Sequence, residues 1–117
     1  MTEICRSTQR FPREEVYGLT SQLRRAAVSI ASNIAEGQAR YSPRDFRNFL
    51  GHARGSLAEI ETQLLIARNL QYLSSTEAAG LEERAAELGR LLNGLHNSIR
   101  IPSSSPDSDT RQLGTGN

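Results

Sequence analysis

The stretch at residues 42–69 reads SPRDFRNFLGHARGSLAEIETQLLIARN and decides the fold. Its apolar residues recur at alternating steps of four and three, which is the heptad pattern of a helix that packs against other helices. Ser42 can cap the helix, Pro43 suits the first helical position, and Asp45 lies in the first turn. We therefore predict a helix over residues 43–70 with a seam of Phe46, Leu50, Ala53, Leu57, Ile60, Leu64 and Ala67.

A second helix follows directly. Ser74 and Glu77 have the spacing of a capping box, in which each residue bonds the backbone of the other. The same four-three rhythm then runs to the end of the segment. This predicts a helix over residues 75–100 with a seam of Ala78, Leu81, Ala85, Leu88, Leu92, Leu95 and Ile99.

A third helix precedes residue 42. The segment YGLTSQLRRAAVSIASNIAEG predicts a helix over residues 18–36, or from as early as Arg13, and Gly37 is its expected C-cap. Its seam is Leu19, Leu23, Ala26 or Ala27, Ile30 and Ile34.

The N-terminal segment is much shorter. TEICRSTQR, residues 2–10, can form only two turns, whereas the helix at 43–70 is ~42 Å long at ~1.5 Å per residue. The expected fold is all-α, an antiparallel up-down four-helix bundle with a truncated first helix, over residues 1–101. Residues 102–117 are rich in Ser, Pro, Gly and Asp, which predicts a disordered tail. So short a first helix would leave a groove along the three long helices. This predicts a marginally stable chain with partly accessible Leu23, Ile30, Leu57 and Leu64.

Polar residues form a stripe along the helix at 18–36. The spacings are three and four, so the members share one face, and a second apolar side carries Val28, Ala31 and Ala35. One interpretation is a water-facing surface. The other is a partly buried polar network at a subunit interface, in which Asn33 occupies a seam position and sets the oligomeric state. Glu59 could meet an Arg of this stripe, whose members are Gln22, Arg25, Ser29, Asn33 and Glu36.

Arginines cluster where two helices join. Every basic residue is Arg, and residues 1–58 hold nine Arg against five acidic residues, although the whole chain has a net charge of only +1. Arg suits bidentate contacts to phosphate, and an exposed Tyr can stack on a base. A nucleic-acid surface is one interpretation and a solvated surface is the other. The candidate residues are Arg40, Tyr41, Arg44 and Arg47, extended by Arg24, Arg25 and Arg54.

Two glycines, Gly51 and Gly55, lie inside the helix at 43–70. Each costs ~1 kcal/mol relative to Ala in a helix, so a compensating close approach between helices is expected.

The remaining residues indicate no enzyme. His52 and His96 lack the Glu-x-x-His pattern of di-iron bundles, so no metal is expected. No general base accompanies a Ser, and no Gly-rich phosphate loop is present, so we expect no cofactor and no small-molecule substrate. A single Cys5 and the lack of an apolar N-terminal or membrane-length run favour a cytoplasmic protein without membrane contact.

Two longer blocks carry a family resemblance. FPREEVYGLTSQLRRAAVSIASNIAEG and FLGHARGSLAEIETQLLIARNLQYL resemble the four-helix-bundle proteins encoded within intervening sequences of 23S ribosomal RNA, over residues 11–100. The resemblance implies a small bacterial protein that forms a cyclic homo-oligomer, a pentamer. It also implies kinship with an accessory protein of diversity-generating retroelements, which binds nucleic acid and a reverse transcriptase. Family members carry a full first helix, most of which is missing here.

These observations predict a non-enzymatic, oligomeric four-helix-bundle module that binds RNA or a nucleic-acid enzyme such as a reverse transcriptase. The alternative is a protein–protein scaffold, or a vestigial intervening-sequence product, without nucleic-acid binding.

Overall fold

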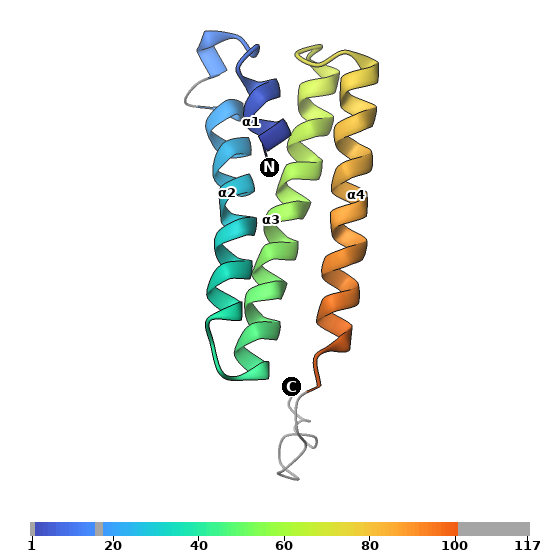
Figure 1. The fold of residues 1–117 in the computed structure, drawn as a ribbon. Helices are drawn as coiled ribbons and strands as arrows, with labels where there is room; N and C mark the ends of the chain where they lie inside the picture. Colours follow the sequence, from blue (N-terminus) through green and yellow to red (C-terminus); the bar gives the residue numbers. More distant parts are fainter. Residues whose placement is uncertain (1, 16–17, 101–117) are drawn as a thin grey trace, which may run out of the picture.

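The computed structural model describes residues 2–15 and 18–100. The described residues form helix α1 (Thr2–Thr8), a short 3-10 turn η1 (Arg13–Glu15), and the helices α2 (Leu19–Gln38), α3 (Pro43–Asn69) and α4 (Ser75–Ser98). Figure 1 shows the three long helices side by side in alternating directions, with short α1 at one end. The predicted all-α up-down bundle is confirmed, and its first helix has only seven residues. The predicted disordered tail at 102–117 lies outside the described residues.

Local capping explains where α3 and α4 begin. The Ser42 side chain accepts a hydrogen bond from the Asp45 backbone N–H at 3.3 Å, and Pro43 occupies the first helical position. Ser74 and Glu77 form the predicted capping box. The Ser74 N–H donates to the Glu77 carboxylate, which is the main reason why the pKa of Glu77 lies below its usual value.

The C-terminus of α3 ends in a Schellman motif. Gln71 adopts a positive φ of 64°, the Tyr72 N–H donates to the Ala67 carbonyl at 2.9 Å, and the Gln71 N–H donates to the Arg68 carbonyl at 3.0 Å. This motif places Tyr72 beside η1. The Tyr72 hydroxyl donates to the Glu15 carboxylate at 2.7 Å, which lowers the pKa of Glu15 and raises that of Tyr72.

Gly37 is not the C-cap that the sequence predicts. It lies inside α2, which continues to Gln38 and is capped by Ala39. Gly37 is buried, and a Cβ there would lie 2.8 Å from Phe46 Cδ1 and 3.0 Å from Phe49 Cβ. The missing side chain therefore lets the end of α2 approach the first turns of α3.

The predicted accessibility of Leu23, Ile30, Leu57 and Leu64 is wrong, because all four side chains are buried. Small seam residues allow α2 and α3 to pack closely, and α4 contributes its own leucines to the same core. Ile4 and Phe11 are also buried and cover one end of this core. A cavity of about 60 Å³ lies beneath α1, lined by Ile4, Ile30, Leu57, Ile60, Leu64, Leu81 and others.

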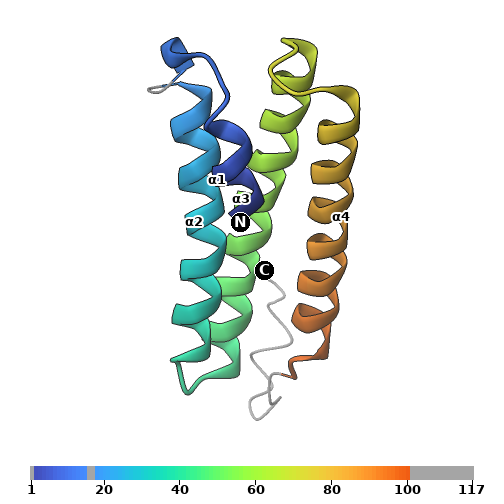
Figure 2. The same ribbon diagram turned by 45° about the horizontal axis from the view of Figure 1, so that its top comes forward.

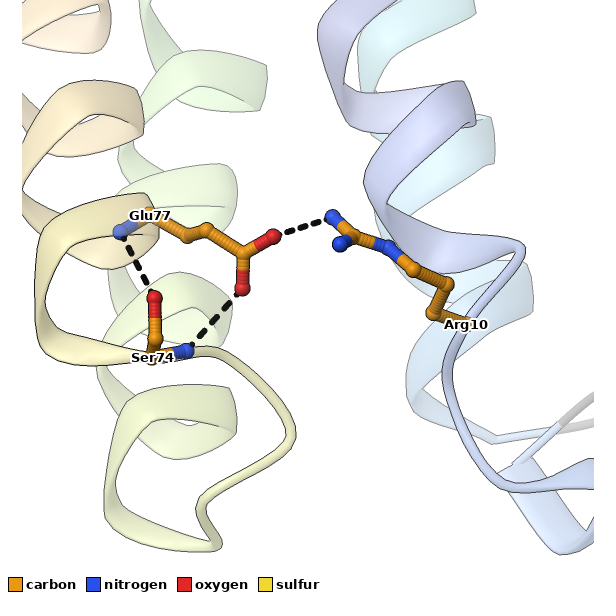
Figure 3. Close-up of polar contacts among 3 residues, drawn as sticks. All are labelled: Arg10, Ser74 and Glu77. Atoms are coloured by element: carbon orange, nitrogen blue, oxygen red, sulfur yellow. Dashed lines mark hydrogen bonds and ion pairs between the residues drawn. The ribbon is translucent and has the colours of Figure 1, made fainter.

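Short α1 bridges α2 and α4. Its contact with α2 includes Arg24, which donates to Thr8 Oγ1 at 2.8 Å and to the Cys5 carbonyl at 3.3 Å. Two ion pairs reach α4 instead. Arg84 pairs with Glu3 at 2.7 Å, and Arg10, just beyond α1, pairs with the capping-box residue Glu77 (Figure 3). The turned view in Figure 2 shows α1 lying over one end of the bundle.

Gly51 and Gly55 do not mark a close approach between helices of this chain, so that prediction is wrong within the bundle. Both are exposed, and a Cβ added to either would meet nothing within 4 Å. They lie on the outer surface of α3, away from α2 and α4. The physical cost of a glycine in a helix is therefore not repaid by packing in the chain itself.

Replacing either exposed glycine with alanine should stabilise the protein. We expect Gly51→Ala and Gly55→Ala each to raise the free energy of unfolding by about 1 kcal/mol, measured by urea denaturation. Gly37→Ala is the matched control and should lower it, because overpacking costs about 1–3 kcal/mol. A loss of stability at Gly51 or Gly55 would instead place that glycine in a contact with another molecule.

Candidate nucleic-acid interface

The turn between α2 and α3 presents the predicted arginine cluster at one end of the bundle. The Ala39 N–H bonds the Ala35 and Glu36 carbonyls, and the Arg40 N–H bonds the Gly37 carbonyl, each at 3.2 Å. Ser42 then caps α3. Four residues therefore reverse the chain with defined backbone bonding, which fixes where the side chains of the turn emerge.

Arg40 and Tyr41 occupy the tip of this turn. The Arg40 guanidinium carbon lies 5.1 Å from the centre of the Phe49 ring, a cation–π geometry that holds the cation near α3. Tyr41 is fully exposed (104 %), so its ring contacts nothing that would bury it. The turn thus offers an oriented cation beside an open aromatic face.

Arg44 and Arg47 follow on the first turns of α3. Arg44 is exposed, whereas Arg47 is half-buried, and its Nε is buried without a hydrogen-bond partner among the described residues. The two are three residues apart, so they are neighbours on the helix surface. Asp45 also lies there and is exposed. The structure therefore keeps Arg40, Tyr41, Arg44 and Arg47 together, as the sequence predicts.

Two of the other three arginines, Arg24 and Arg25, do not extend this cluster. Arg24 is occupied in holding α1 against α2. Arg25 lines a cleft between α2 and α3, and Arg54 lines a different cleft between α3 and α4. Arg54 shares a face of α3 with Arg47, so its part in the predicted surface stays a prediction.

A family model described as 23S rRNA-intervening sequence protein matches residues 1–94. This chain belongs to the 23S rRNA-intervening sequence protein family. None of the curated proteins matches it. The resemblance seen in the sequence is thus confirmed at the level of the family, whereas kinship with retroelement accessory proteins remains a prediction. None of the helices in residues 2–15 and 18–100 combines the length and hydrophobicity that a membrane crossing requires.

Three residues of the polar stripe of this 23S rRNA-intervening sequence protein, Gln22, Arg25 and Ser29, line the α2–α3 cleft, which has a volume of about 780 Å³. Ser29 Oγ lies 2.9 Å from Ser56 Oγ, and Asn33 Nδ2 donates to the Ser29 carbonyl at 2.8 Å and to Ser29 Oγ at 3.0 Å. These side chains form a partly buried network within the chain, while Glu36 faces water. A role of this network at a subunit interface stays a prediction.

The same cleft also carries Gln22, Gln63 and a pair of opposite charges. Gln63 Nε2 donates to Gln22 Oε1 at 3.2 Å. Arg25 and Glu59 both line the cleft, but no ion pair joins them among the described residues. Glu59 and Arg25 therefore line the same cleft, but the structure does not show the predicted contact between them.

Arg90 and Asn93 are the site residues that sequence reasoning missed in this 23S rRNA-intervening sequence protein. Both lie on α4 and line the α3–α4 cleft with Arg54. The heptad pattern could have indicated them, because residues that flank the α4 seam on one side must lie beside α3. Phe49 was missed too, because its role depends on the path of the turn.

Proposed function

We propose that this chain is a non-enzymatic, oligomeric four-helix-bundle module that binds RNA through the end formed by the α2–α3 turn. The supporting observation is the fully exposed Tyr41 ring in the same turn as Arg40, next to the start of α3 that carries Arg44 and Arg47. Guanidinium groups bind phosphate oxygens, and an open aromatic ring stacks on an unpaired base. An exposed Tyr has no packing role in the chain, so its place among cations favours a ligand that uses both.

Electrostatics support the same end of the molecule. Arg44 is exposed and makes no ion pair among the described residues, so its guanidinium is open to a phosphate oxygen. The net charge of +1 is too small to attract RNA over long distances. An oligomer would present several copies of the arginine cluster to one RNA. For this reason the proposal combines oligomerisation with RNA binding.

A second apolar side of α2 supports self-association. Val28 is 60 % exposed, and Ala31 and Ala35 are exposed with it. Burying this face against another copy would remove apolar area from water. Light scattering on the purified chain should give a multiple of the 12.9 kDa mass, and a monomer at all concentrations would contradict this part. The same face also suits the alternative, a scaffold that binds a protein such as a nucleic-acid enzyme and no RNA.

Replacing Arg40, Arg44 and Arg47 together with Ala should weaken RNA binding about 10- to 100-fold at low salt and flatten the salt dependence by about two units of slope. Fluorescence anisotropy with a labelled single-stranded RNA measures both. The control removes three exposed arginines elsewhere, Arg6, Arg13 and Arg68, and so has the same net charge. Equal losses in both variants, or no wild-type binding, would contradict the proposal.

A further inference from the structure

The cleft between α3 and α4 forms a second, distinct concave surface of about 310 Å³. Arg54 and Glu61 line it from α3, and Gly89, Arg90 and Asn93 line it from α4. Gly89 lies against Leu57, because a Cβ there would be in ordinary van der Waals contact with the Leu57 side chain at 3.4 Å. The cleft thus brings two guanidinium groups and an amide together from different helices.

Both cations of the cleft are available to a ligand. Arg54 is exposed and makes no hydrogen bond or ion pair within the described part of the chain. Arg90 pairs with Glu83 only at 3.4 Å, and its side chain remains 66 % exposed. Such an exposed pair contributes little and is readily exchanged for another anion. The Glu61 carboxylate is the acidic group that lines the cleft, at the far side of Arg54 from the turn.

The cleft continues the arginine cluster of the turn. Arg47 and Arg54 are seven residues apart on α3, which places them on the same face at a distance of about 10 Å along the axis. Cations therefore follow one another from Arg44 through Arg47 to Arg54 and Arg90. The row ends where Glu61 reverses the sign of the charge.

We infer that the α3–α4 cleft binds the phosphate backbone of an unpaired RNA strand, one of whose bases stacks on Tyr41. This inference rests on the proposed function and names its substrate class. A row of guanidinium groups with Asn93 matches successive phosphodiesters. Tyr41 can stack only on a base that is not already stacked in a duplex, which favours a single strand over a double helix.

The test replaces Arg54 and Arg90 with Ala and measures anisotropy with a labelled oligouridylate and with an RNA duplex of equal length. We expect about 5- to 10-fold weaker binding of the single strand and a salt slope smaller by about 1.4, as two lost phosphate contacts predict. The wild-type chain should prefer the single strand. An Arg6→Ala, Arg68→Ala double variant is the charge-matched control and should bind as the wild type does.

Other outcomes overturn the inference in distinguishable ways. Unchanged affinity and slope in the Arg54, Arg90 variant, with a loss in the Arg40, Arg44, Arg47 variant, would remove the cleft from the path and leave the proposed function standing. No RNA binding by the wild type would overturn both. If the cleft variant loses affinity for polyglutamate as strongly as for RNA, the cleft is a site for acidic peptides. Thermal melts of each variant exclude unfolding as the cause.

Discussion

Replacing Leu64 with Ala should cost about 2–5 kcal/mol of folding free energy, a large part of the 5–15 kcal/mol that typically stabilises a domain. Leu64 is only 1 % exposed and sits in the core where α3 faces the other helices. The change enlarges the cavity of about 60 Å³ that Leu64 already lines. The lost contacts around this larger cavity add to the cost of removing the buried methyl groups. Urea denaturation followed by circular dichroism measures the loss.

The neighbouring residue gives the matched control for Leu64. Leu65 is 48 % exposed, and Leu65→Ala removes the same atoms one position along α3. Its cost should stay below about 1 kcal/mol, because less apolar area returns to water and no cavity forms. Similar costs for the two variants would show that the α3 seam does not face the core in the register described.

Replacing Phe11 with Ala should cost about 3–5 kcal/mol. Phe11 is buried, and its ring centre lies 5.4 Å from that of Tyr72. It therefore joins the segment after α1 to the turn between α3 and α4. Losing it would also disturb the placement of Tyr72, whose hydroxyl bonds Glu15. The midpoint of urea unfolding should fall accordingly.

Tyr41→Ala is the control for Phe11, since it removes an aromatic ring that is fully exposed. Its stability should equal that of the wild type, although its affinity for RNA should fall. If Phe11→Ala were tolerated to within about 1 kcal/mol, the N-terminal segment would contribute little to the fold. The remaining helices would then have to hold the core by themselves.

The helices could be predicted because their signals are local. Ser42 and Ser74 cap helices through bonds to residues three positions along, and such bonds depend on no other part of the fold. The seam of α3 was also readable, since six of its seven predicted members are buried and Phe46 is partly buried. Heptad spacing alone determines that face.

Features that depend on neighbouring helices could not be predicted. Gly37 has the sequence pattern of a C-cap, but the approach of Phe46 places it inside α2. The sequence pattern leaves Arg24 available to nucleic acid, whereas in the structure its guanidinium bonds Thr8 of α1. The position of Arg54 beside α4 could not be predicted, because a single helix does not reveal which of its faces meets α4.

The bridge that α1 makes to α4 has a kinetic consequence. Contacts between α2 and α3, and between α3 and α4, join helices that are consecutive in the chain, so their loops close at small entropic cost. Topologies of this low contact order fold quickly. The Glu3–Arg84 pair instead spans 81 residues. Closing that loop directly from the unfolded chain would cost more entropy than joining consecutive helices, so we expect this pair to form after the three long helices have assembled.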